Sequence, residues 1–178
     1  MLLPERMRPA RVSAKKINEL AKMAEQILSE IDKGADQDNT ELKKKMADWN
    51  SQVITPCKFS DFRDYSAHTN ARDFVRAALN YAKYYADFTW SELVQTINYV
   101  CNGNASDSEQ HHALLLLENN FNGNVSDLIY WPDVWFQIAE IPDVEFTSEE
   151  LAAYLMTRSG RVLADAPDIE LRYPIPDC

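Results

Sequence analysis

A short helix is predicted by the stretch Ser126-Asp127-Leu128-Ile129-Tyr130-Trp131-Pro132, which lies in the second half of the chain. The Ser126 hydroxyl can accept a backbone N–H that has no partner inside the first helical turn, so Ser126 is expected to cap the helix. Pro132 is expected to end it, because proline has no backbone N–H to donate. The asparagine-rich stretch from Asn119 to Asn124 predicts a turn immediately before this helix.

Longer helices are predicted on both sides of this stretch. Thr89 and Glu92 have the spacing of a capping box, and so do Thr147 and Glu150. Each box indicates that a helix begins at its threonine. A further helix is predicted over residues 107–120, between the first capping box and the asparagine-rich turn.

The first half is also predicted to be helical. Apolar residues recur at helical spacing over residues 13–33, 40–52 and 70–86, with a short aromatic segment at 59–65. Residues 1–86 are therefore expected to form a helical accessory domain of unknown role.

Strand patterns are weak throughout the chain. Only residues 134–146 and the proline-rich tail from Pro167 could each supply a short strand. The predicted fold class is therefore mainly α.

Charge is distributed unevenly along the chain. Residues 1–86 hold 15 Lys and Arg against 12 Asp and Glu, a net of +3, whereas residues 87–178 hold 3 against 16, a net of −13. No Lys or Arg occurs from Asp87 to Thr157. The total of −10 argues against nucleic acid and anionic membrane as partners. We expect an acidic surface that attracts a basic protein, since complementary fields raise association rates. Acidity that serves solubility alone is the alternative.

The sequence predicts neither an enzyme nor a cofactor or metal site. No nucleophile elbow, Walker loop or dinucleotide-binding fingerprint is present, so no catalytic residues are proposed. His111 and His112 are adjacent and cannot both point at one metal ion from a helix. The 3 cysteines are widely spaced and fit neither a disulfide framework nor a zinc pattern. In the absence of an apolar secretory or membrane-spanning segment, the expected location is the cytoplasm.

The second half resembles the colicin and pyocin DNase immunity proteins, a family of small acidic four-helix proteins. The third helix of that family has the pattern Ser/Thr-Asp-Leu-Ile-Tyr-Tyr-Pro, and residues 126–132 differ from it only at Trp131. The segment from Asp87 to Val94 and the pair Cys101-Asn102 resemble the first helix, and the segment from Thr147 to Gly160 resembles the fourth.

The resemblance covers residues 86–161, which is less than half of the chain. It implies that residues 87–178 form an immunity-type four-helix bundle with an apolar insert and an extended tail.

The resemblance also implies a toxin-neutralising function. Such immunity proteins bind the catalytic domain of a nuclease toxin made by the same cell, beside its active-site cleft, and so exclude DNA. The toxin would be a bacteriocin or an effector of contact-dependent growth inhibition or of a secretion system. Carried over to this chain, the contact residues shared by the family lie on the third helix, at Ser126, Asp127, Tyr130, Trp131 and Pro132. The residues that choose among toxins lie on the second helix, at Asp107, Glu109, His111, Leu114 and Glu118.

Two features of the second half depart from the family. The pair His111-His112 stands where the family has apolar and acidic residues, so the class of toxin does not transfer, and an RNase partner stays open. Residues 134–141 are apolar where the family is polar. They either pack against the accessory domain, or they form the fourth helix themselves over 133–141 in place of 147–158.

Several alternatives to this interpretation follow from the residues themselves. Tyr130 and Trp131 could be ordinary core aromatics, and most of the four leucines Leu114–Leu117 are expected in the core, with Leu114 as the outward one. The first half could be a diverged duplicate of the second. The chain could also be a helical adaptor that binds another basic protein.

Overall fold

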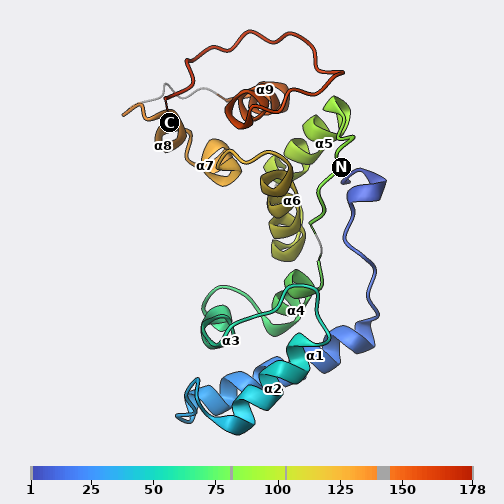
Figure 1. Ribbon diagram of the computed structural model, residues 1–178, viewed down its shortest axis with the longest axis vertical. Helices are drawn as coiled ribbons and strands as arrows, with labels where there is room; N and C mark the ends of the chain where they lie inside the picture. Colours follow the sequence, from blue (N-terminus) through green and yellow to red (C-terminus); the bar gives the residue numbers. More distant parts are fainter. Residues whose placement is uncertain (1, 81, 103, 140–144, 178) are drawn as a thin grey trace. The chain divides into compact units, whose positions relative to one another are not determined.

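The computed structural model describes residues 2–80, 82–102, 104–139 and 145–177 and is mainly helical, which confirms the predicted fold class (Figure 1). No strand occurs among the described residues of the tail or of the segment 134–146, while residues 140–144 lie outside the described part. The α-helices of the described residues are α1 (Ala14–Asp32), α2 (Thr40–Asn50), α3 (Phe59–Asp64), α4 (Ala71–Leu79), α5 (Trp90–Cys101), α6 (Asp107–Asn120), α7 (Val125–Tyr130), α8 (Pro132–Phe136) and α9 (Ser148–Ser159).

The chain divides into two compact units. Unit 1 consists of Met1–Arg8, Ala82–Ala105 and Ala113–Cys178, and unit 2 of Pro9–Tyr81 and Ser106–His112. The division differs from the expected boundary at residue 86 in two places. The segment Met1–Arg8 groups with the second half, and the first turns of α6 group with the first half.

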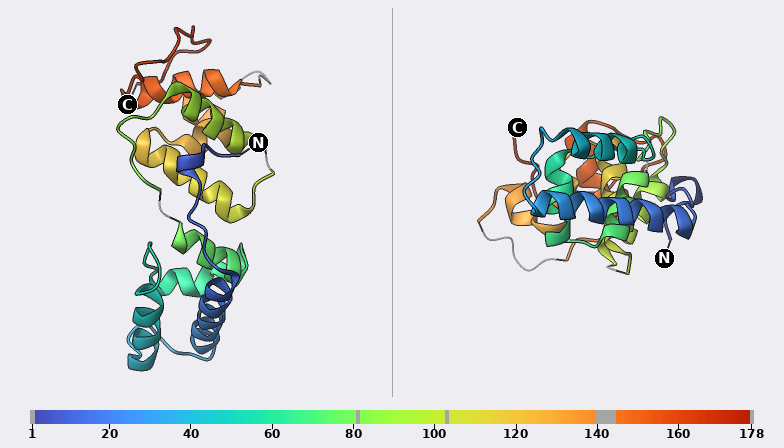
Figure 2. Two further views of the ribbon diagram at one scale, coloured as in Figure 1. Left: turned by 90° about the vertical axis from the view of Figure 1, so that its right-hand side faces the viewer. Right: turned by 90° about the horizontal axis from the view of Figure 1, so that it is seen from below.

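Unit 2 is built around α1, which packs against α2, α3 and α4 (Figure 2). Its core contains the fully buried Trp49, whose Nε1 donates a hydrogen bond of 3.0 Å to the Leu20 carbonyl. The Trp49 ring lies edge-on to Phe62 and stacks on Phe74. Because an unpartnered indole N–H would be costly in such a core, the Leu20 carbonyl fixes both the ring and the approach of α2 to α1.

The helix predicted over residues 70–86 ends earlier, at Leu79. The side chains of Asn119 and Asn120 donate to the carbonyls of Ala82 and Lys83, and the Asn120 side chain accepts from the Tyr85 amide. These backbone groups are thus satisfied by side chains of unit 1 and not by a helical ladder.

Unit 1 is built on the contact between α5 and α9, and α7 packs against α8 and α9. Both predicted capping boxes are present: Glu92 and Thr89 bind each other's backbone amides at the start of α5, and Glu150 and Thr147 do so at the start of α9. The core of this unit includes Leu93, Ile97, Leu116, Leu117, Phe121 and Leu155, all of which are fully buried.

Of the apolar insert 134–141, Trp135 and Phe136 are buried within unit 1, while residues 140 and 141 lie outside the described part. Trp135 and Phe136 belong to the core of unit 1 and form an edge-on ring cluster with Tyr154 of α9. Among the described residues of the insert, helix occurs in α8, which ends at Phe136, whereas Ser148–Ser159 forms the long helix that contacts α5.

The tail is held against α9 by hydrogen bonds. The Tyr154 hydroxyl accepts from the Tyr173 amide at 2.7 Å, and Arg158 donates to the Pro176 carbonyl at 2.8 Å. None of the described helices has the length and apolar character needed to cross a membrane.

Candidate functional site

Helix α7 begins in a way that the sequence did not predict. Its N-cap is Asn124, which adopts the left-handed conformation (φ 54°) and makes no side-chain cap hydrogen bond. The Glu118 carboxylate, from the end of α6, accepts the Val125 amide instead. Ser126 therefore lies inside the first turn, with its side chain exposed, and the expectation that it caps the helix was wrong. The cap comes from Glu118, which is 7 residues before Val125 on the other side of the asparagine-rich turn, so the capping pattern at Ser126 did not indicate it.

A sharp break at Trp131 separates α7 from α8. Trp131 has φ −136° and ψ 59°, its amide donates to the Asp127 carbonyl at 2.9 Å, and its carbonyl accepts the Trp135 amide at 3.0 Å. Pro132 occupies the first position of α8, where a missing N–H costs nothing. Gln137, in the left-handed conformation (φ 57°), ends α8. The proline therefore ends α7 as predicted and also starts a second helix.

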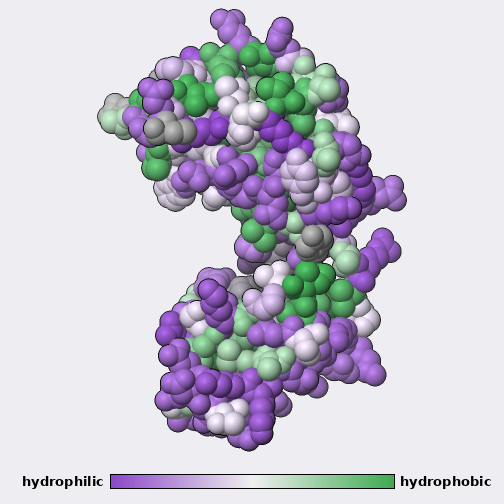
Figure 3. All heavy atoms as spheres, in the orientation of Figure 1, coloured by the Kyte–Doolittle hydropathy of each residue, from purple (hydrophilic) through white to green (hydrophobic). Residues whose placement is uncertain are grey.

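The α7–α8 segment has a buried and an exposed side. Leu128, Trp135 and Phe136 are at most 5% exposed, whereas Tyr130, Trp131 and Val134 are 42%, 61% and 59% exposed. We call these last three residues the α7–α8 patch. Tyr130 and Trp131 are consequently not core aromatics. In Figure 3, hydrophobic side chains appear in green between hydrophilic ones on the face shown.

The buried side fixes the direction of the exposed side. The Trp135 indole Nε1 donates to the Gly123 carbonyl at 2.8 Å, and the Phe136 ring lies edge-on to Tyr154 at 4.8 Å between centroids. A Cβ at Gly123 would lie 3.0 Å from the Leu155 side chain, so the loop before α7 also lies close against α9. Turning Val134 inward would expose Trp135 or Phe136, and the patch is therefore held outward.

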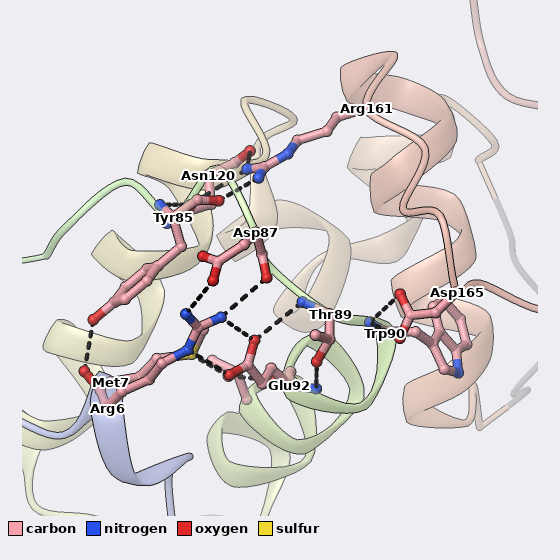
Figure 4. Close-up of polar contacts among 11 residues, drawn as sticks. Arg6, Met7, Tyr85, Asp87, Thr89, Trp90, Glu92, Asn120, Arg161 and Asp165 are labelled. Carbon is pink, nitrogen blue, oxygen red and sulfur yellow. Dashed lines mark hydrogen bonds and ion pairs between the residues drawn. The ribbon is translucent and has the colours of Figure 1, made fainter.

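Carboxylates flank the α7–α8 patch. Asp133 is exposed, whereas Asp127 and Pro132 are half-buried. The three arginines in the second half of the chain bind groups of their own unit. Arg161 donates to the carbonyls of Asn120 and Tyr85 (Figure 4). Arg158 lies over the Trp135 ring and Arg172 pairs with Glu150.

The segment of residues 2–8 adds its cations to the same unit (Figure 4). Arg6 binds both oxygens of Glu92, at 2.6 and 2.7 Å, and one oxygen of Asp87 at 2.8 Å. These hydrogen bonds lower the pKa of Glu92 and the pKa of Asp87 below their ordinary values. These arginines of unit 1 thus pair with carboxylates or carbonyls of the same unit or pack on its rings. The charge that unit 1 presents to solvent therefore comes mainly from its other carboxylates.

The residues expected on the second helix fall in two different units. Asp107, Glu109 and His111 are exposed but belong to the part of α6 that groups with unit 2. The Glu109 carboxylate also accepts from the amide and hydroxyl of Ser106, at 3.0 and 2.8 Å, so it caps α6.

Leu114 and Glu118, both half-buried, belong to unit 1. Leu114 packs against the core of that unit, although it was expected as the outward leucine, and Leu115 is also half-buried. The α7–α8 segment, with Val134 added to it, is taken as the candidate site because its exposed aromatics belong to one unit. The contact role of the second-helix residues stays a prediction.

Among the described residues, no group of three or more His, Cys, Asp and Glu side chains is placed to hold a metal ion. In comparisons with known proteins, no protein-family model matches the chain, and no curated protein or solved structure is significantly similar to it.

Proposed function

We propose that the chain is an immunity protein, which neutralises a nuclease toxin of the same cell by binding tightly beside the toxin's active site. The observation that carries this proposal is the exposure of Tyr130 and Trp131, 42% and 61%, at the end of a short helix whose other side is buried. These are the residues that the resemblance to nuclease immunity proteins marks as contacts.

The physical properties of these side chains favour a binding role. Tyrosine and tryptophan bury a large area on binding while few rotatable bonds are frozen, and they dominate the residues that contribute most to protein interfaces. Exposed large aromatics that are held rigidly by the core behind them also lose little conformational entropy on binding. Trp131 has an indole N–H where the immunity family has a tyrosine hydroxyl. The partner should therefore present a hydrogen-bond acceptor at this position.

The charge of unit 1 supports a basic partner. Its residues include 6 Lys and Arg against 15 Asp and Glu, a net of −9. A nuclease binds phosphate through Lys and Arg, so its surface near the cleft is basic and complementary to this unit. Occupation of that surface would block nucleic acid sterically and would repel its phosphates.

The test is protection from the toxin. We expect a nuclease domain to be encoded beside this chain. That domain is expressed with and without the chain, and growth, nuclease activity and the dissociation constant are measured. Protection of growth together with tight binding is the expected result. Binding without any effect on nuclease activity would instead indicate a helical adaptor for a basic protein, and failure to bind or to protect would exclude an immunity role.

Single substitutions then locate the contact. We expect Tyr130→Ala and Trp131→Ala each to weaken binding by about 2 kcal/mol or more. Tyr84→Ala, which removes another exposed tyrosine of unit 1 (57% exposed), is the matched control and should leave binding close to that of the unaltered chain. Unchanged dissociation constants for both Tyr130→Ala and Trp131→Ala, with the helical content intact, would contradict the proposed contact.

A further inference from the structure

Helix α8 presents an apolar side chain that neither the resemblance nor the hydrophobic pattern assigned to a binding surface. Val134 is 59% exposed and lies between the exposed Trp131 and the buried Trp135. Of the 7 large hydrophobic side chains that are exposed in the described chain, 3 fall within residues 130–134. Scattered apolar side chains are normal on a protein surface, whereas three within five residues of one segment favour an interaction site.

The direction of Val134 follows from the short length of α8. This helix has five residues, Pro132–Phe136, and its consecutive Trp135 and Phe136 are both in the core. Because a helix of little more than one turn can bury one side only, Asp133 and Val134 are left outside. Gln137 ends the helix in a left-handed conformation and its amide binds the Val134 carbonyl, which fixes the last turn.

We infer that α8 is a second contact element for the nuclease, in which Val134 enters an apolar depression and Asp133 pairs with a neighbouring Lys or Arg of the partner. The inference rests on the proposed function. It commits to a basic partner because the exposed Asp133 adjoins Val134, the half-buried Asp127 precedes Trp131, and unit 1 as a whole has a net charge of −9, from 6 Lys and Arg against 15 Asp and Glu.

This arrangement gives α8 a role in specificity. Aromatic residues in the centre of an interface supply much of the affinity, whereas an apolar side chain beside a charge accepts only a partner with a matching pocket and an opposite charge. Variation at residues 133 and 134 should therefore change which nuclease is bound without removing the contact made by Tyr130 and Trp131.

The experiment uses the full chain and the nuclease domain that is expected to be encoded beside it. Val134→Asp places a carboxylate in the expected apolar contact and should raise the dissociation constant about tenfold or more. The matched control is Val162→Asp, which makes the same change at a valine of unit 1 that is 76% exposed, and it should leave the constant within about twofold. Thermal unfolding of both variants checks that the fold is kept.

A second pair of variants tests the charge. Asp133→Asn should weaken binding and reduce the dependence of the dissociation constant on salt, because one ion pair is lost. Asp168→Asn, at another exposed aspartate of unit 1, should change neither.

The outcomes separate this inference from the proposed function. If Val134→Asp and Asp133→Asn bind like the unaltered chain while Trp131→Ala is weakened, α8 is not a contact element and the immunity function stands. If the unaltered chain does not bind the nuclease domain, both proposals are overturned.

Discussion

Trp131 and Trp135 lie in one short segment and have opposite environments. Trp131 is 61% exposed, whereas Trp135 is 5% exposed and donates its indole N–H to the Gly123 carbonyl. The same residue type thus occupies two environments that mutation can distinguish. Burial of a large aromatic ring contributes to stability through lost water contact and close packing, while an exposed ring contributes little until a partner covers it.

We predict that Trp135→Ala lowers the free energy of unfolding of unit 1 by about 3–5 kcal/mol, as expected for a buried aromatic side chain. Trp131→Ala should change it by less than about 0.5 kcal/mol. Urea unfolding of the two variants, followed by circular dichroism, measures both. Equal losses would mean that Trp131 packs as a core residue and would count against the α7–α8 patch as a surface.

Gln137 is a second residue of interest, because its backbone conformation should lower the free energy of unfolding by a measurable amount. It is exposed and adopts φ 57°, a region that is unfavourable for a side chain with a Cβ. Gln137→Gly should raise the free energy of unfolding by roughly 0.5–1 kcal/mol, after allowance for the greater freedom of glycine in the unfolded chain. Asn124→Gly should raise the free energy of unfolding by less, because asparagine tolerates the left-handed region better than glutamine does. A loss of stability in Gln137→Gly would show that its side chain makes a necessary contact.

At the scale of elements, the segment of residues 2–8 is attached to α5 by ionisable groups. Arg6 donates to Glu92 and Asp87, and the Tyr85 hydroxyl donates to the Arg6 carbonyl at 2.6 Å. The hydrogen bonds from Arg6 depress the pKa of Glu92 and of Asp87. Depressed folded-state pKa values stabilise the protein above the unfolded-state values, near pH 4, and this stabilisation is lost as pH falls through the folded-state values.

We therefore predict that Arg6→Met destabilises unit 1 at neutral pH, and that the difference from the unaltered chain shrinks below about pH 4. Urea unfolding between neutral and acidic pH provides the measurement. Arg8→Met is the matched control, because the Arg8 Nε binds the Leu3 carbonyl, which does not titrate in this range. Parallel stability curves for Arg6→Met and the unaltered chain would contradict a role for the two carboxylates.

The elements that could be predicted from the sequence are those whose ends are set by local residues. The starts of α5 and α9 follow from Thr89 with Glu92 and Thr147 with Glu150, which lie within one turn of each other. The end of α4 and the start of α7 were missed. The side chains of Asn119 and Asn120 bind backbone groups of residues 82, 83 and 85, just beyond α4, and Glu118 binds the Val125 amide at the start of α7. These partners lie outside the segments that they bind, so the local pattern does not indicate them.

The candidate site was predictable to a similar degree. The motif at residues 126–132 indicated Tyr130 and Trp131, and both are exposed in the structure. Val134 was grouped with its apolar neighbours, because hydrophobicity alone does not separate it from Trp135 and Phe136. The difference arises from the break at Trp131 and the left-handed Gln137, which together determine the single side that α8 buries.

At the scale of the whole molecule, each unit has a hydrophobic core of its own. The core of unit 2 includes Trp49, Phe62 and Val75, and that of unit 1 includes Ile97, Phe121 and Tyr154. Two separate cores predict that damage to one unit leaves the other folded, since cooperative unfolding follows shared buried contacts.

We predict that Trp49→Ala removes about 3–5 kcal/mol from the stability of unit 2 but leaves binding through Tyr130 and Trp131 intact. Hydrogen exchange resolved by segment should accelerate in α1, α2 and α4 and stay unchanged in α5 and α9. Equal acceleration in α9 would indicate that the two units unfold as one. The dissociation constant for the nuclease domain, measured on the same variant, tests whether unit 2 is needed for the proposed contact.

The pairing of Arg6 with Glu92 joins residues that are 86 positions apart, and this separation limits when the contact can form during synthesis. At about 5–20 residues per second, residues 2–8 leave the ribosome roughly 4–17 s before Glu92 follows. We expect Leu3 and Met7, which are 2% and 1% exposed in the folded protein, to stay in contact with solvent for at least that time, because the core that buries them extends to Leu163. Most of unit 2 is completed in the interval, because Pro9–Tyr81 is one continuous stretch. Because local contacts form before distant ones, we expect unit 2 to fold first and residues 2–8 to attach to unit 1 afterwards.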